Sequence, residues 1–257
     1  FRKQLSSGEA HYTGEADVIE PSQPGGGEET MKERELTSLS VINNTLIKNA
    51  SVSAEEFVRD DMLAVKARRE QLALLRGDGA NNTPRGIFHR VAAANRITAV
   101  QAGAEATLAE IRKDVSRIMT LLKNANAPMI RPVWMTNPTV EEFLYTVLNE
   151  LGLPVYEAML DQGKWARGFP FETTTQLPAD LGGGGNESEL ALVDFSEVIL
   201  GVGPMYLDVF PNGTYEEGGK VKSGISRNQT VIRLIDYHDI FMRHEESGVV
   251  CNVKYGA

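Results

Sequence analysis

The sequence predicts an α+β fold. Three observations lead to this prediction: an N-terminal stretch rich in Gly, Pro and Glu, a long capped helix, and a run of strand-type residues from residue 190 onward. The chain of 257 residues is 42% hydrophobic, which is enough for one large or two small domains with buried cores.

The charge and the cysteine content exclude several classes of function. A formal net charge of −9 argues against wrapping a nucleic-acid backbone, because such binding relies on Lys and Arg. The sequence holds no apolar run near the ~20 residues of a membrane span, so no membrane partner is expected. Cys251 is the single cysteine and cannot form an internal disulfide, which fits a reducing compartment. Since the chain begins with Phe1 and not with Met, we expect that an N-terminal segment of the protein is missing from this sequence.

The first 30 residues differ from the rest of the chain and have almost no apolar periodicity. The stretch GEAHYTGEADVIEPSQPGGGEET, residues 8–30, cannot build a core. Two interpretations remain open: a disordered terminus, or a long two-legged loop that projects from the body. In the second case residues 34–49 form the returning leg, because they are rich in Thr, Val, Ile and Leu.

A long helix is predicted over residues 54–76. Ser53 stands at its N-cap with Glu56 three residues later, which is a capping box. Gly77 follows Arg76 and is expected to end the helix in a left-handed conformation. At 1.5 Å per residue the helix would be roughly 35 Å long. Its expected apolar stripe consists of Val58, Met62, Val65, Leu72 and Leu75.

Two further helices and a strand are predicted in the middle of the chain. The first helix shows apolar residues at helical spacing: Leu108, Ile111, Val115, Ile118 and Leu122. In the strand MIRPVWM, Pro132 predicts an edge position or a bulge. The second helix begins after the cap Asn137 with Pro138 and is expected to be stopped by Gly152. Its inward residues are expected to be Val140, Phe143, Leu144, Val147, Leu148 and Leu151.

The C-terminal part is predicted to be rich in strands. Residues 161–189 are loop-like, and the runs LALVDF and EVILGVG follow as two short strands. The run YLDVFPNGTYEE is predicted to be a hairpin that turns at Asn212 and Gly213. A long strand is expected in QTVIRLIDYHDIFMRH, followed by a short strand in GVVCNV.

Cofactor and metal motifs fail on spacing. A phosphate loop requires G-x-x-x-x-G-K-S/T, but in GTYEEGGKVKS the extra Gly219 displaces Lys220 by one position. A calcium loop starting at Asp78 would have Ala80 at its third position and Thr83 where Gly is required. We therefore expect no cofactor and no metal.

The most chemical-looking cluster is His238 with Asp236 and Asp239. A His–Asp pair could orient a general base. In a strand, however, His238 and Asp236 share a face while Asp239 points away, so a partly buried, hydrogen-bonded structural histidine is favoured. The sequence has no G-x-S-x-G elbow and no zinc-type spacing, and we predict no catalytic residue.

The stretch LLRGDGANNTPRGI, residues 74–87, connects the long helix to the middle of the chain. With the order of elements around it, it resembles the major capsid protein family of tailed bacteriophages, which has the Hong Kong 97 fold. The later segment LVDFSEVILGV and the long C-terminal strand resemble that family too. The residues that match its helix-end turn are Leu74, Leu75, Gly77, Asp78, Gly79, Gly86 and Ile87.

The resemblance implies a domain organisation. Residues 1–40 would be an extended loop over a neighbouring subunit. Residues 41–96, with the spine helix 54–76, and residues 190–257 would form a peripheral domain, and residues 97–189 an axial domain. The turn residues Gly77, Asp78, Gly79 and Gly86 would be structural. The loop residues expected to contact the neighbour are Tyr12, Glu15, Asp17 and Glu20.

The resemblance also implies a function. The chain would self-assemble into pentamers and hexamers of an icosahedral phage or prophage head around double-stranded DNA, bound without sequence specificity. Portal, scaffold and decoration proteins would be further partners. The site of action would be the virion, after assembly in the host bacterial cytoplasm.

One departure concerns covalent crosslinking. Some members join a lysine of the extended loop to an asparagine of a neighbour. Here residues 14–27 contain no lysine, and Asn228 near the acceptor region has no evident partner, so no self-crosslinking is expected.

Three alternatives remain. The first is an encapsulin-type bacterial nanocompartment shell on the same fold. The second is a small α+β hydrolase-like enzyme that uses His238, Asp236 and Asp239. The third is a non-viral adaptor with a disordered N-terminus.

Overall fold

The computed structural model describes residues 2–6, 25–28, 30–45, 54–100 and 106–255. The chain divides into two compact units, Phe1–Lys32 and Glu33–Ala257. In the first unit, β1 (Arg2–Ser6) pairs antiparallel with β2 (Gly25–Glu28). The returning leg that pairs with the first leg is therefore β2, and the expectation that residues 34–49 play this part was wrong.

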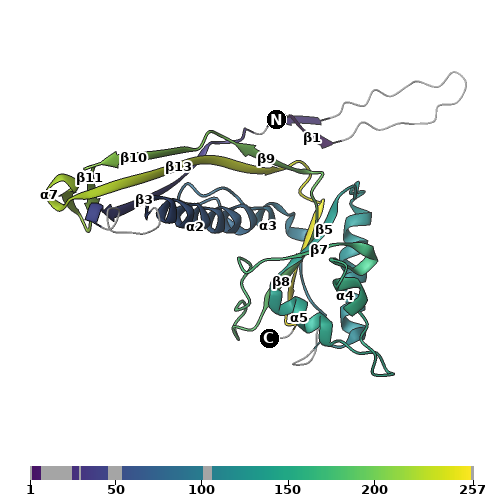
Figure 1. The fold of residues 1–257 in the computed structure, drawn as a ribbon. Helices are drawn as coiled ribbons and strands as arrows, with labels where there is room; N and C mark the ends of the chain where they lie inside the picture. Colours follow the sequence, from purple (N-terminus) through teal and green to yellow (C-terminus); the bar gives the residue numbers. More distant parts are fainter. Residues whose placement is uncertain (1, 7–24, 29, 46–53, 101–105, 256–257) are drawn as a thin grey trace, which may run out of the picture. The chain divides into compact units, whose positions relative to one another are not determined.

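The second unit contains a sheet built around the long strand β13 (Gln229–Met242) (Figure 1). One edge of β13 pairs antiparallel with β3 (Arg34–Asn43). The other edge pairs first with β10 (Tyr206–Pro211) and then with β9 (Val198–Val202), both antiparallel. The predicted long strand is confirmed, and residues 34–43 lie in this sheet.

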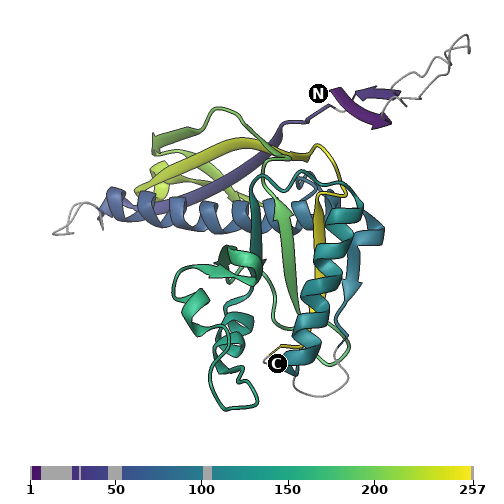
Figure 2. The same ribbon diagram turned by 90° about the vertical axis from the view of Figure 1, so that its right-hand side faces the viewer.

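Helix α2 (Ala54–Arg76) lies along one face of this sheet (Figure 2). Every second residue of β13 and β3 points to the helix, and Met62 packs there on Ile42, Ile232 and Leu234. The predicted helix end at Arg76 is confirmed. The predicted stripe is wrong at Val65, which is 49% exposed, because the helix covers a sheet on one side only and buries a narrow stripe.

A second, six-stranded sheet lies in the same unit. Pro132 begins β5 (Pro132–Thr136), a strand with neighbours on both sides, so the predicted edge or bulge is wrong. A proline is tolerated at the first residue of a strand. Residues 161–189, predicted to be loop, supply two of the strands. In order across the sheet the strands are β4 (Arg96–Thr98), β14 (Gly248–Val253), β8 (Ser188–Asp194), β5 (Pro132–Thr136), β7 (Phe169–Thr173) and β6 (Lys164–Trp165).

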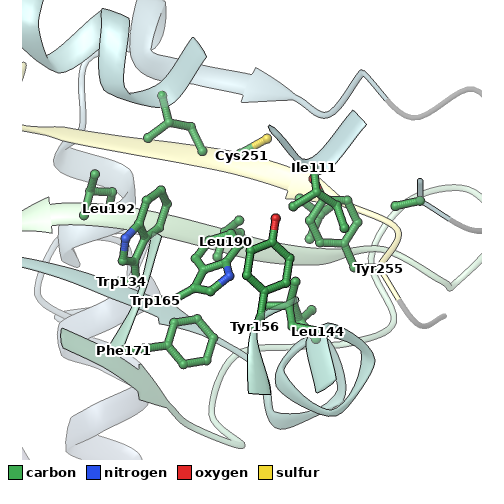
Figure 3. Close-up of a cluster of buried hydrophobic side chains, with 14 of the residues drawn as sticks. Ile111, Trp134, Leu144, Tyr156, Trp165, Phe171, Leu190, Leu192, Cys251 and Tyr255 are labelled. Carbon is green, nitrogen blue, oxygen red and sulfur yellow. The ribbon is translucent and has the colours of Figure 1, made fainter. Parts of the chain in front are cut away.

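Both faces of this sheet are covered, which explains why all seven residues of β8 are buried. Leu190 and Leu192 face a core formed with α4 (Leu108–Asn124), α5 (Pro138–Thr146) and α6 (Glu157–Leu160). In this core the rings of Trp134 and Trp165 meet edge to face, with centroids 4.8 Å apart (Figure 3).

The opposite face of β8 packs on the region that follows α2. Ala191 and Val193 contact a core that includes Leu75 and residues of α3 (Ile87–Arg90). Two short 3₁₀ turns complete the helical elements, at Ala93–Asn95 and Ala166–Gly168. The helix predicted at 108–122 and the Asn137 cap of α5 are confirmed; the Asn137 side chain accepts a hydrogen bond from the Thr139 N–H.

Helix α5 ends at Thr146, five residues earlier than the predicted end at Leu151. After Thr146 the chain forms a tight turn in which the Asn149 side-chain oxygen accepts hydrogen bonds from the N–H groups of Leu151 and Leu153. Such side-chain bonds compete with helical ones. Leu148 and Leu151 are consequently exposed, contrary to the prediction.

The hairpin predicted around Asn212 and Gly213 does not form. Strand β10 pairs with β13, while β11 (Thr214–Glu217) pairs with β12 (Lys220–Ser223), followed by α7 (Gly224–Arg227). The β11–β12 turn uses Gly218 and Gly219, which both have a positive φ that glycine adopts without strain. No helix among the described residues is long and apolar enough to cross a membrane.

Candidate functional site

The helix-end turn, residues 77–86, is closed by backbone hydrogen bonds. The Gly77 N–H donates to the Ala73 carbonyl, and the Gly77 carbonyl accepts from the Gly86 N–H at 2.9 Å. An antiparallel bridge joins Asp78 to Arg85. At the tip, Asn81 and Asn82 both have a positive φ, a conformation that asparagine tolerates better than most residues.

The glycines of this turn have different roles. Gly77 does not adopt the predicted left-handed conformation. Instead, a Cβ there would lie 2.1 Å from the Pro84 carbonyl oxygen, so only glycine lets the two backbone segments approach. The same restriction applies to Gly86, because an added Cβ would lie 2.6 Å from the backbone of Leu75. Gly79 is the left-handed residue, with φ of +80°.

The carboxylate of Asp78 is used inside the turn. It accepts hydrogen bonds from the Ala80 N–H at 2.9 Å and from the Thr83 hydroxyl at 3.0 Å. These bonds lower the pKa of Asp78 below its ordinary value, because they favour the charged form. The geometry is that of a side chain that holds a loop together.

The end of α2 is also tied to the six-stranded sheet. The Arg76 guanidinium lies 2.8 Å from the Glu189 carboxylate at the start of β8. Burial raises the pKa of Glu189, and the charges of Arg76 and Arg96 oppose that rise. The helix-end turn therefore lies where α2 meets both sheets.

An ionic cluster joins α2 to β13 farther back along the helix. The Lys66 ammonium lies 2.7 Å from the Glu70 carboxylate and 2.8 Å from that of Asp236. Burial alone would lower the pKa of Lys66, but the hydrogen bonds to the two carboxylates outweigh it and raise that pKa. Its pairing therefore stabilises the fold below pH 10.5 and is lost as the pH rises through the higher folded value.

The ionic cluster borders the side chain of His238 and limits the partners that this side chain can have. His238 is 3% exposed, as expected for a structural histidine, and its Nδ1 lies 3.4 Å from Asp236. The expected hydrogen bond is not made, since Nδ1 has no hydrogen-bond partner among the described residues. Asp236 is shared with Lys66, and Asp239 lies on the opposite side of the strand, where it accepts from the Ile240 N–H. The three residues do not form a general-base arrangement.

A strip of exposed apolar side chains lies along the free edge of the first sheet and was not predicted from the sequence. We call it the β9–β10 strip. In β10 the apolar residues are exposed and the charged Asp208 is the least exposed, paired at 2.7 Å with Arg233. Strands normally show the reverse pattern. The strip consists of Leu200, Val202, Met205, Tyr206, Leu207, Val209 and Phe210.

Several predicted residues lie outside the described part of the chain. Ser53 precedes the described start of α2, so the predicted capping box with Glu56 stays a prediction; Glu56 itself is exposed. The predicted loop contacts Tyr12, Glu15, Asp17 and Glu20 also lie outside it. Asn228, the crosslink candidate, accepts a hydrogen bond from the Asn44 side chain at 3.0 Å.

Sequence comparisons give similar proteins over most of the chain. The profile described as the phage capsid family matches residues 1–252. The major capsid protein of Klebsiella oxytoca phage phiKO2 is 34% identical over 244 residues, which cover 94% of this chain and 56% of that protein. The capsid polyprotein of Pseudomonas phage PAJU2 is 23% identical over 77% of this chain and 28% of that protein. The chain thus spans about half or less of these relatives.

Solved structures show the same fold at low sequence identity. A structure from Mycobacterium phage Bobi has a TM-score of 0.76 and 14% identity, covering 99% of this chain and 84% of that one. A structure from Microbacterium phage Oxtober96 has a TM-score of 0.75 and 12% identity, with coverages of 99% and 84%. The capsid of a native GTA particle has a TM-score of 0.73 and 14% identity, with coverages of 98% and 83%.

Proposed function

Because the chain belongs to the phage capsid family, as its resemblance predicted, we propose that it is a structural subunit of an icosahedral phage or prophage head. In this proposal, copies assemble into pentamers and hexamers in the host bacterial cytoplasm and remain in the virion. They enclose double-stranded DNA without sequence-specific contacts. Portal, scaffold and decoration proteins are further partners, and the chain carries no catalytic activity. The relatives named as capsid proteins favour a head over an encapsulin-type compartment.

The single observation that carries self-assembly is the reversed exposure of β10. The β9–β10 strip lies on a sheet edge whose backbone N–H and C=O groups have no strand partner among the described residues. Soluble monomers protect such edges with charges or short strands, and large apolar patches mark protein contacts. In a closed shell, a heterologous contact with a second copy covers this edge.

The N-terminal unit fits the role of a connecting arm. Phe1–Lys32 forms a unit of its own, held by the β1–β2 pairing. We propose that its loop contacts a neighbouring copy through Tyr12, Glu15, Asp17 and Glu20. Residues 41–96 and 190–257 act as the peripheral domain, and residues 97–189 act as the axial domain at the symmetry axes.

A charge placed in the β9–β10 strip tests the proposal. Val209 is 44% exposed in β10, so Val209→Lys leaves the fold intact and places a charge in the contact. Thr214→Lys in the neighbouring exposed strand β11 is the matched control. Sedimentation velocity of the purified full-length protein should show large assemblies for the wild type and for T214K, and small species for V209K. Monomers for all three proteins would contradict self-assembly; equal assembly of all three would contradict the role of the strip.

A further inference from the structure

We propose that a pocket between α2, β3, β13 and the helix-end turn binds an oxyanion, that is, a phosphate or carboxylate group. The pocket has a volume of about 210 Å³. Its polar lining includes Arg34, Arg69, Asn81, Asn82 and His238. Guanidinium groups and amide N–H groups are donors that match the oxygens of such anions.

Two of the donors are placed by the strand register. Arg34 in β3 stands directly opposite His238 in β13, so both side chains leave the sheet on the face that α2 covers. Arg69 is contributed by α2 itself. Three elements that are distant in sequence thus direct nitrogen donors into one pocket.

Two buried nitrogen atoms in this pocket make no hydrogen bond to a described residue. They are the Nε of Arg34 and the Nδ1 of His238, although Nδ1 lies 3.4 Å from the Asp236 carboxylate. Arg34 and Arg69 also have no ion pair among the described residues, in contrast to Arg76 at the end of the same helix. Buried polar groups in folded proteins nearly always have a partner, and an anion in the pocket would supply one.

The acidic groups nearby are already used or point away. Glu35 also lines the pocket, but it lies next to Arg34 in β3, so its side chain leaves the sheet on the opposite face. Asp236 and Glu70 share the Lys66 ammonium, and the Asp78 carboxylate is bonded within the turn. The two arginines are therefore the charged groups left to attract a ligand.

The direct test is a calorimetric titration of the purified full-length protein with inorganic phosphate at constant ionic strength. Saturable binding by the wild type is expected. Arg69→Gln removes a charge-assisted hydrogen bond and should weaken binding about tenfold. Arg69 is exposed, so this change is tolerated by the fold; Arg34→Gln is the second variant and should weaken binding to the same degree.

Arg68→Gln is the matched control, because Arg68 is the neighbouring exposed arginine of α2 and does not line the pocket. Its affinity should stay within about twofold of the wild type. Equal affinities of R68Q, R69Q and R34Q would show general charge attraction and would overturn the proposed site.

A parallel titration with acetate separates the two ligand sources. Tighter binding of phosphate would identify a phosphate ligand. Equal or tighter binding of acetate would identify a carboxylate, such as an acidic side chain of another chain. Saturable binding of neither anion would overturn the proposal. Because the titration does not depend on shell formation, its outcome is independent of the proposed assembly function.

Discussion

Single residues in the helix-end turn decide whether the chain can pass from α2 to α3. Gly77 and Gly86 lie where two backbone segments approach so closely that no side chain fits. Gly79 has space around it and is needed for its positive φ. The two kinds of glycine have different energetic costs on substitution.

We predict that Gly86→Ala destabilises the protein more than Gly79→Ala does. The new Cβ of G86A would lie 2.6 Å from the Leu75 backbone, and such overpacking costs about 3 kcal/mol. G79A costs about 1 kcal/mol, because alanine tolerates a positive φ poorly but meets no clash. Urea unfolding of both variants measures the order. A larger loss for G79A would show that the close approach at Gly86 relaxes.

Lys66 gives a second prediction. Lys66→Met leaves the buried Asp236 without a cation and should cost about 3 kcal/mol of unfolding free energy. Adding Asp236→Leu should recover more than half of this loss, because both charges are then gone. The control Lys113→Met changes an exposed lysine of α4 and should stay within about 0.5 kcal/mol. The same unfolding midpoints test it; an unchanged K66M would mean that the ionic cluster contributes nothing.

Residue roles were predictable only where the signal is local. The Asn137 cap is visible in the sequence because the cap bonds to its own helix. Gly77 was predicted for the wrong reason, since the atom that excludes a side chain belongs to Pro84. The link between Lys66 and Asp236 connects residues 170 positions apart, and no pattern along the chain reveals it.

At the scale of elements, Asp194 connects two segments, the end of β8 and the residues just before β5. Its carboxylate accepts hydrogen bonds from the N–H groups of Ile130, Arg131 and Ser196. It thereby fixes the start of β5 against the end of β8. Burial by itself would raise the pKa of Asp194, but these hydrogen bonds outweigh burial and lower it.

We predict that Asp194→Asn costs about 2 kcal/mol at pH 7, where the carboxylate is charged. Since the folded pKa lies below the ordinary 3.8, this contribution is present above pH 3.8 and is lost as the pH falls through the folded value. Urea midpoints of D194N and the wild type should therefore converge in acid. The control Asp60→Asn, at an exposed position, should follow the wild type at every pH. A gap between D194N and the wild type that is independent of pH would contradict the assignment.

Long elements were predicted better than short ones. The end of α2 at Arg76 and the position of the long strand β13 agree with the prediction, while the capping box at Ser53 stays a prediction. The end of α5 was missed because the Asn149 side chain competes with the helix. The predicted hairpin at Asn212 failed because β13 offers β10 a full-length partner, a competition between distant segments that local turn residues do not record.

At the scale of the whole molecule, the Hong Kong 97-type α+β fold and the capsid family were both predictable from the order of elements around one turn. The assembly surface was not predictable, because the residues of the β9–β10 strip look like ordinary strand residues in the sequence. Its exposure becomes visible only once β10 is known to occupy a sheet edge.

Electron cryomicroscopy of particles assembled from the full-length protein tests the central claim most directly. We predict closed shells in which the β9–β10 strip of each copy is covered by a second copy of the chain. A full-length protein that stays monomeric at high concentration, or shells that leave this strip in solvent, would contradict it.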